Sequence, residues 1–153
     1  MQGENKILVR NRRARRDYFI LEKLEVGIAL QGSEVKSLRA GKGNLQESYA
    51  SIEADGVWLH NFHISPYQAG GSYIPLPTRN RRLLLHRREI KKLIGKTTLK
   101  GNTLIPLSVY LRGGYVKVEL GVVQGKKFYD KREAIKKREA GREISKALKY
   151  RQR

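Results

Sequence analysis

Short strand-like runs separated by tight turn signals restrict the fold of this chain more than any other feature. The runs are rich in β-branched and aromatic residues or alternate apolar with polar residues, as half-buried strands do. They predict strands over residues 18–23, 25–30, 49–53, 57–64, 103–111 and 115–122. Asp55-Gly56 and Gly113-Gly114 are hairpin turn signals between the third and fourth runs and between the last two.

These strands predict a mainly β domain, a small OB-like barrel with two or three short helices. Pro106 has no N–H group to donate to a neighbouring strand, so it indicates a sheet edge or a bulge. Residues 65–78 contain two clusters of Pro, Gly and Ser, which predict a surface loop.

One helix is expected to begin at Glu34, with Ser33 as its N-terminal cap. Val35 and Leu38 are three residues apart and would lie on its buried side. Gly41 can end the helix, because glycine readily takes the backbone conformation that follows a helix.

A second helix is expected over residues 89–94. Ile90, Leu93 and Ile94 have the spacing of one buried helix face, and Gly95 can end the helix.

Positive charge is segregated along the chain. The formal net charge is +19, from 33 basic and 14 acidic residues. Solubility does not require charge of one sign, so this segregation favours binding to a nucleic acid over simple solvation. The net charge by segment is +5 over residues 1–16, −3 over 17–78, +6 over 79–92, +3 over 93–124 and +8 over 125–153.

The charge pattern divides the chain into a basic arm over residues 1–16, a barrel over 17–130 and a basic tail over 131–153. The tail has few apolar residues and mostly positive charge, so we expect it to be disordered when free. An anionic membrane is a weaker alternative partner, because no basic stretch carries an inserting apolar face. No run approaches the ~20 apolar residues of a membrane span.

The sequence offers little for catalysis, and we expect no enzyme, cofactor or metal. There is no cysteine, so thiol chemistry and Cys-ligated zinc are excluded. His60 and His63 are three apart in one predicted strand, so they would point to opposite faces. The absence of a clustered acidic or histidine site also weighs against a nuclease. A soluble, cytoplasmic protein is expected.

Aromatic residues accompany the basic stretches. Tyr18 follows Arg12 and Arg13, and Lys126-Lys127 precede Phe128-Tyr129. Arginine binds phosphate, whereas aromatic rings stack on unpaired bases. The residues therefore predict an RNA-binding barrel with basic extensions. A basic ribosomal protein or a generic RNA-binding protein remains open at this point.

A series of ordered motifs resembles the small protein B family of SsrA-binding proteins, which bind tmRNA in bacterial trans-translation. The motifs are Asn11-Arg12-Arg13-Ala14, Gly27-Ile28, Gly32-Ser33-Glu34-Val35-Lys36-Ser37-Leu38-Arg39, Ser48-Tyr49, His63-Ile64 with Pro66-Tyr67, Arg81-Arg82-Leu83-Leu84-Leu85-His86, Gly125-Lys126-Lys127 and Asp130-Lys131-Arg132.

The resemblance implies an OB-fold adaptor that binds the tRNA-like domain of tmRNA and brings it to stalled ribosomes. It also implies a tail that folds as a helix in the empty mRNA channel. Alanyl-tRNA synthetase and elongation factor Tu would be partners indirectly, through tmRNA. The protein itself would not be an enzyme.

The resemblance also implies two sets of site residues. Glu34 is one of the residues expected at the RNA surface, but it could instead form only a local ion pair with Lys36 or Arg39. If it serves the RNA surface, Glu34→Ala should weaken tmRNA binding at nearly unchanged melting temperature. Residues expected to face or support tmRNA are Asn11, Arg12, Arg13, Glu34, Lys36, Ser37, Arg39, Arg81, Arg82 and His86. Residues expected to begin the ribosome-facing tail are Lys126, Lys127, Tyr129, Asp130, Lys131 and Arg132.

Overall fold

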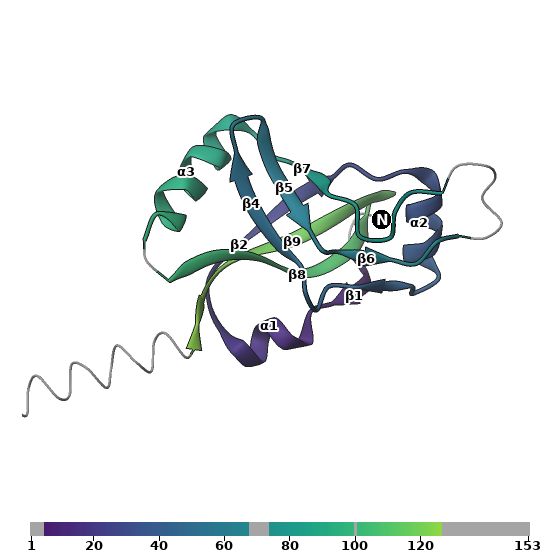
Figure 1. Cartoon of the computed structure of the whole chain (residues 1–153), viewed down its shortest axis with the longest axis horizontal. Helices are drawn as coiled ribbons and strands as arrows, with labels where there is room; N and C mark the ends of the chain where they lie inside the picture. Colours follow the sequence, from purple (N-terminus) through teal and green to yellow (C-terminus); the bar gives the residue numbers. More distant parts are fainter. Residues whose placement is uncertain (1–4, 68–73, 100, 127–153) are drawn as a thin grey trace, which may run out of the picture.

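The computed structural model describes residues 5–67, 74–99 and 101–126. Within these ranges the chain forms nine strands and three helices, which are labelled in Figure 1. Their bounds are β1 Lys6–Arg10, α1 Arg12–Asp17, β2 Tyr18–Ile28, α2 Gly32–Arg39, β3 Gly43–Asn44, β4 Tyr49–Glu53, β5 Gly56–His60, β6 His63–Ile64, β7 Arg81–Leu84, α3 Arg87–Thr97, β8 Asn102–Arg112 and β9 Tyr115–Gly125.

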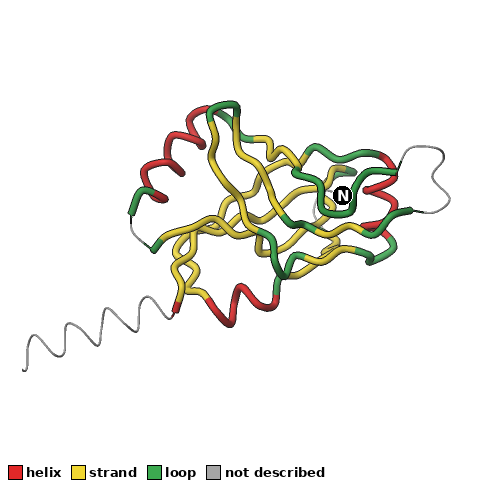
Figure 2. Tube along the Cα trace, in the orientation of Figure 1, coloured by secondary structure: helices red, strands yellow, loops and turns green. Residues whose placement is uncertain are grey.

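The main sheet closes into a barrel. Seven antiparallel strands follow the order β1-β8-β4-β5-β7-β2-β9, and β8 also pairs with β9. This extra pairing joins the ends of a six-strand ring, and β1 pairs with residues 108–111 of β8, beyond the point where β4 pairs at Leu104. The helices lie around the strands rather than among them (Figure 2). The prediction of a mainly β, OB-like barrel with short helices is confirmed.

Alternate residues of the strands fill the barrel interior, as the two-residue period of a strand requires. The central core includes Val26, Ile28, Val57, Leu59, Leu83, Leu104, Val109, Val118, Leu120 and Val122. A second cluster lies between α1 and the outer surface of the β8–β9 hairpin, where Ala14 packs with Ile105, Leu107 and Val123. Strand β8 is therefore buried on both faces along residues 104–107.

Part of the expected N-terminal arm belongs to the barrel. Strand β1 pairs with β8 from Lys6 to Arg10, and Val9 is 8% exposed in the core. Charge counting assigned residues 1–16 to an arm because their bases dominate. However, the backbone of β1 completes the edge of β8, and its bases remain exposed.

Two strand predictions need correction. The runs 18–23 and 25–30 form one strand, β2, which pairs with β9 from Tyr18 to Gly27. A bulge between Ile20 and Glu22 absorbs an extra residue, so the strand bends instead of ending. The run 57–64 is two strands, because Asn61 has a positive φ of 59° that extended structure does not allow.

The helix ends also differ from prediction. Helix α2 begins at Gly32 and is capped by Gln31, whose backbone N–H donates to Glu34 at 2.9 Å, so Ser33 is not the cap. Helix α3 continues through Gly95 to Thr97, because Asn102 donates to the Lys96 carbonyl and helps hold the last turn.

Burial agrees with the expected helix faces only in part. Leu38 and Leu93 are buried, as predicted, whereas Ile94 is 45% exposed. Gly41 follows α2 with a φ of +76° and donates to the Leu38 carbonyl, which confirms the predicted stop.

The turn and loop signals gave correct results. Strand β4 pairs with β5 across the Asp55-Gly56 turn, and β8 pairs with β9 across Gly113-Gly114. The register of the second hairpin shifts between Pro106 and Ser108, so the bulge alternative for Pro106 is confirmed. The described residues of 65–78 form no helix or strand.

Candidate RNA-binding surface

A buried ion-pair network lies beneath α2. Glu34 is 3% exposed and accepts from Arg81 Nε at 2.7 Å and from Arg79 Nη2 at 2.5 Å. Arg81 is fully buried and also donates to the carbonyls of Phe62 and Pro77. This network therefore joins α2, β7 and the loop that precedes β7.

The Glu34 carboxylate stays charged despite its burial. Burial acts to raise the pKa of Glu34, but hydrogen bonds from Arg79, the Gln31 backbone and Arg81 outweigh it and lower the pKa below its ordinary value. Burial also lowers the pKa of Arg81, but a guanidinium remains protonated in proteins. Both carboxylate oxygens accept hydrogen bonds from this chain, so Glu34 holds α2 in position against β7 and the loop before it.

The network holds α2 in place, and basic side chains lie on the outer side of this helix. Ser37, which is fully buried, donates to the Ser65 carbonyl at 2.6 Å and fixes the inner side of the helix. Lys36 and Arg39 are exposed on the helix. Lys36 Nζ lies 5.6 Å from the Tyr67 ring centroid, a cation–π contact that orients the ammonium group. Such an exposed, ordered cation can bind phosphate.

Asn11 fastens α1 to the barrel. Its Oδ1 accepts from the Ala14 N–H at 3.1 Å, which caps the helix. Its Nδ2 donates to the Pro106 carbonyl at 2.9 Å and to the Leu45 carbonyl at 3.3 Å. At 4% exposure, Asn11 has both polar side-chain atoms bonded within the protein, and these bonds position α1.

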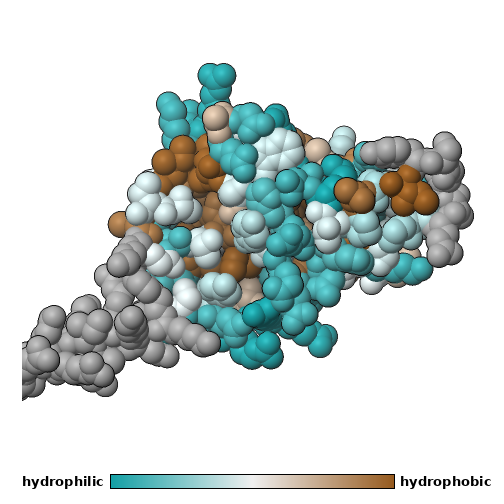
Figure 3. All heavy atoms as spheres, in the orientation of Figure 1, coloured by the Kyte–Doolittle hydropathy of each residue, from teal (hydrophilic) through white to brown (hydrophobic). Residues whose placement is uncertain are grey.

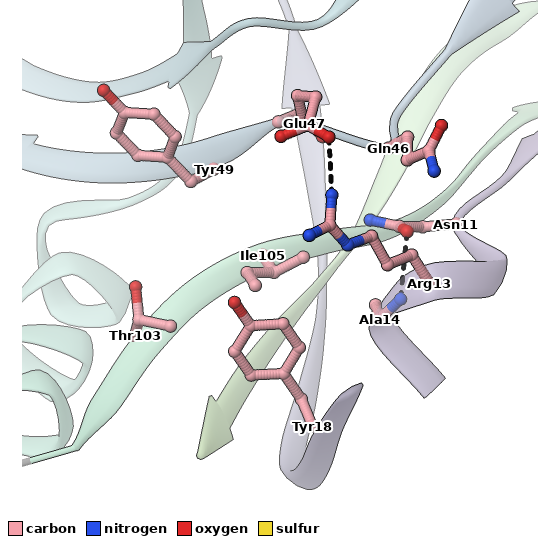
Figure 4. A pocket seen from close by; sticks show the side chains of 10 residues that line it. Asn11, Arg13, Ala14, Tyr18, Gln46, Glu47, Tyr49, Thr103 and Ile105 are labelled. Carbon is pink, nitrogen blue, oxygen red and sulfur yellow. Dashed lines mark hydrogen bonds and ion pairs between the residues drawn. The ribbon is translucent and has the colours of Figure 1, made fainter. Parts of the chain in front are cut away.

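An open cleft lies beside α1, with a volume of about 260 Å³ (Figure 4). Tyr18 and Tyr49 stand on its walls, with Thr103 and Ile105 between them. Arg13 closes one end, where its guanidinium is 2.5 Å from Glu47 and 3.1 Å from Asp17. The cleft combines aromatic planes, which can stack on an unpaired base, with an arginine whose charge is balanced by Glu47 and Asp17.

Helix α1 also carries bases that face solvent. Arg12, Arg15 and Arg16 are exposed, and hydrophilic side chains cover the region of α1 at the lower edge of the molecule (Figure 3). Arg15 and Arg16 were not singled out from the sequence, although they continue the same basic run.

The structure divides the residues expected to contact RNA into two groups. Arg12, Lys36, Arg39, Arg82 and His86 are exposed, whereas Arg13 is partly exposed and ion-paired. Asn11, Glu34, Ser37 and Arg81 are instead buried, and their side chains are bonded within the protein. The expectation that they support the surface is consistent with this geometry.

Sequence reasoning missed Arg79 and the bases of α3. Arg79 shares Glu34 with Arg81, and only the fold shows this pairing. Arg87, Arg88, Lys91 and Lys92 are exposed on α3. Their spacing along a helix was the available signal.

The expected tail lies mostly outside the described residues. Lys127, Tyr129, Asp130, Lys131 and Arg132 fall there, as does the rest of 131–153. Lys126 is described: its Nζ lies 5.5 Å from the Phe19 ring centroid and donates to the Arg15 carbonyl at 3.4 Å. The last described residue is therefore tied to β2 and α1.

No group of three or more acidic or histidine side chains in the described ranges could hold a metal ion. His60 and His63 lie on different strands, and His60 is bonded to Ser51 and Asn80. None of the helices in that part of the chain is long and apolar enough to cross a membrane.

The chain is similar to known proteins along almost its whole length. The family model described as SmpB protein matches residues 8–150. An SsrA-binding protein of Geobacillus thermodenitrificans (strain NG80-2) is 55% identical over 152 residues, covering 99% of this chain and 98% of the relative. The SsrA-binding protein of Bacillus subtilis (strain 168) is 53% identical over 148 residues, covering 97% and 95%.

A solved structure agrees with the fold. It is entitled "tmRNA-SmpB: a journey to the center of the bacterial ribosome", and one of its chains is 50% identical to this one. The match has a TM-score of 0.66 and covers 77% of this chain and 83% of the other. The match of family model, relatives and barrel shows that this chain belongs to the SmpB family of SsrA-binding proteins.

Proposed function

We propose that this chain binds the tRNA-like domain of tmRNA and delivers it to stalled ribosomes for trans-translation, in which the nascent peptide is tagged. The observation that carries the proposal is the match to SsrA-binding proteins over 152 residues at 55% identity. The solved relative in the tmRNA–SmpB structure, at 50% identity, supports it.

The protein acts as an adaptor and not as a catalyst. It belongs to an RNA-binding family. Its described polar networks, such as Glu34 with Arg79 and Arg81, hold the fold in place. Alanyl-tRNA synthetase and elongation factor Tu are reached through tmRNA, and the process takes place in the cytoplasm.

The barrel and the tail bind different partners. The exposed residues Arg12, Lys36, Arg39, Arg82 and His86 contact tmRNA, because exposed cations neutralise phosphate and a histidine ring can stack on a base. The buried residues Asn11, Glu34, Ser37 and Arg81 hold these elements in place. Lys126, Lys127, Tyr129, Asp130, Lys131 and Arg132 begin the tail, which enters the empty mRNA channel and folds there as a helix.

The division can be tested with two changes in the full chain. The double variant Lys36→Ala, Arg39→Ala removes two exposed charges from α2, whereas truncation after Arg132 removes most of the tail. Filter binding to tmRNA across a salt series should show a marked loss for the α2 variant. The truncated protein should lose little affinity, with a slightly shallower salt slope.

A peptide-tagging assay on a truncated message then measures the function of each variant on the ribosome. The truncated protein should fail to tag although it retains tmRNA. The charge-matched control Lys6→Ala, Arg10→Ala removes two exposed bases from β1 and should bind tmRNA better than the α2 variant. Equal losses in both double variants would mean that only total charge matters, and normal tagging without the tail would refute its role.

RNA captured from a bacterial lysate separates this function from general RNA binding. Sequencing should recover one dominant RNA with a tRNA-like end. A broad ribosomal RNA profile would instead identify a generic basic RNA-binding protein.

A further inference from the structure

The outer face of strands β4, β5 and β7 carries two rows of aromatic and polar side chains. In one row, Trp58 lies opposite Ser51 of β4 and opposite Arg82 of β7. In the next row, His60 lies opposite Tyr49. The intervening residues, such as Leu59, are buried in the barrel, so these rows point outward.

Trp58 and Arg82 form a pair that Asp55 holds in place. The guanidinium carbon of Arg82 is 5.1 Å from the Trp58 ring centroid. Asp55, in the β4–β5 turn, accepts from the indole N–H at 2.9 Å and lies 3.5 Å from Arg82 Nη2. The Arg82 side chain is 45% exposed. The carboxylate therefore orients both planes while leaving the pair open to solvent.

Tyr49 and His60 form a second pair. Their ring centroids are 5.0 Å apart with an interplanar angle of 26°. Both imidazole nitrogens are engaged, with Ser51 Oγ at 2.6 Å and Asn80 Oδ1 at 3.0 Å. These bonds fix the ring, while Tyr49 is 46% exposed and also lines the cleft beside α1.

The Ser51, His60 and Asn80 contacts have the order of a nucleophile, a base and an orienting group, but they do not form a catalytic site. The Ser51 hydroxyl also donates to Glu53 at 3.1 Å, so its proton is shared with a carboxylate. The cleft beside α1 is lined by Tyr49 and not by Ser51. The bonds serve to hold the imidazole plane.

We propose that this face is a stacking platform for unpaired bases of single-stranded RNA, with one base on the Trp58–Arg82 pair and one on the Tyr49–His60 pair. Aromatic and guanidinium planes bind bases of any sequence, because every base has a flat π surface. Trp58 and His60 are two residues apart on β5, or about 6.6 Å, which suits neighbouring bases of an extended strand.

Charge and chain geometry support a nucleic acid as the occupant. Arg82 provides a cation within the platform, and the exposed Arg87 and Arg88 of α3 follow β7 directly in the chain. Figure 3 shows no continuous apolar surface over β4 and β5, so an apolar protein helix is not the occupant that this face fits. The platform shares Arg82 with the proposed tmRNA surface, and it adds unpaired RNA bases outside the tRNA-like domain to what this chain binds.

Trp58 makes the proposal directly testable, because it is the only tryptophan in the chain. A base that stacks on it should quench its fluorescence. The probe is a single-stranded oligoadenylate of about twelve nucleotides, a length within the site sizes of OB folds. We expect saturable quenching by this RNA and little change with inorganic tripolyphosphate, which supplies charge without bases.

Three variants test the stacking role by anisotropy of a labelled oligoadenylate. Trp58→Ala should weaken binding about tenfold, as loss of one stacked base predicts. Trp58→Phe should retain most of the affinity, because it keeps a ring. Arg82→Lys should weaken binding although the charge remains, because lysine has no plane. The control Tyr115→Ala alters a ring that is 73% exposed in the β8–β9 hairpin, and it should bind normally.

Oligoadenylate that binds by anisotropy without quenching Trp58 would overturn the proposal, as would parental affinity in Trp58→Ala. The quenching result comes from the unaltered protein, so it holds even if Trp58→Ala does not fold. Filter binding of tmRNA to the same proteins separates the two proposals. Quenching by oligoadenylate without tmRNA binding would support the platform and refute tmRNA delivery.

Discussion

Glu34 and Arg81 form an ion pair that is almost completely removed from solvent, with side chains 3% and 0% exposed and Nη2 of Arg81 2.6 Å from Oε2 of Glu34. Neither charge can return to water without moving α2 away from β7. The pair therefore makes the position of α2, and of the exposed Lys36 and Arg39 on it, depend on one carboxylate.

Replacement of Glu34 should destabilise the protein strongly. Glu34→Gln leaves Arg81 buried without a counter-charge, which costs about 3–5 kcal/mol when one partner of a buried pair is lost. Urea unfolding would measure the change in free energy. This reverses the expectation from sequence that the melting temperature would hardly change.

Glu47→Gln is the matched control for the Glu34 variant. It removes the same charge from a pair with Arg13, but the Glu47 side chain is 72% exposed. Exposed pairs contribute about 0–1 kcal/mol. Equal free energies of unfolding for the two variants would show that burial of the Glu34 pair has no energetic consequence.

Acid should remove the contribution of Glu34. Its pKa is lowered in the folded state, so its stabilising effect is complete above the unfolded pKa, near the ordinary 4.5. That effect declines as the pH falls below this value and through the lower folded pKa. Unfolding free energies measured between pH 7 and pH 3 should fall more steeply for the parent than for Glu34→Gln. Parallel curves would contradict the linkage.

Asn11→Ala should loosen α1. The change removes the cap of the helix and leaves the Pro106 and Leu45 carbonyls without their side-chain donor. Loss of the cap alone costs about 0.5–2 kcal/mol. Hydrogen exchange should show faster exchange of α1 amides. Arg12→Ala is the control, and an equal effect there would rule out the anchoring role of Asn11.

Gly43→Ala should overpack the contact between β3 and the core. An added Cβ would lie 2.7 Å from Leu38 Cδ2 and 2.8 Å from Val9 Cγ2. Overpacking of this kind costs about 1–3 kcal/mol. Gly32→Ala is matched in chemistry but meets nothing within 4 Å, so its thermal midpoint should be unchanged or higher. The reverse order of midpoints would contradict the packing argument.

The barrel was predictable because strand signals are local. Alternation over residues 49–53 and the turn at Asp55-Gly56 determine a hairpin without reference to the rest of the chain. The missing N–H of Pro106 similarly indicated the bulge between it and Ser108. The continuity of β2 was not predictable, because it depends on pairing with β9, which continues on both sides of the bulge.

The candidate surface was predictable only as a set of motifs. Arg12, Lys36 and Arg39 were identified and are exposed. Arg79 was missed because it is 45 residues from Glu34, and sequence spacing carries no information about such a contact.

The sequence by itself determined the mainly β class, the two hairpin turns, the segregation of positive charge and the family motifs, because each depends on neighbouring residues or on composition. Only the tertiary structure decided which polar residues face solvent. Asn11, Glu34 and Arg81 have the chemistry of binding residues, but distant carbonyls and charges satisfy them inside the protein. Their role follows from partners that the fold brings together, and local pattern cannot specify those partners.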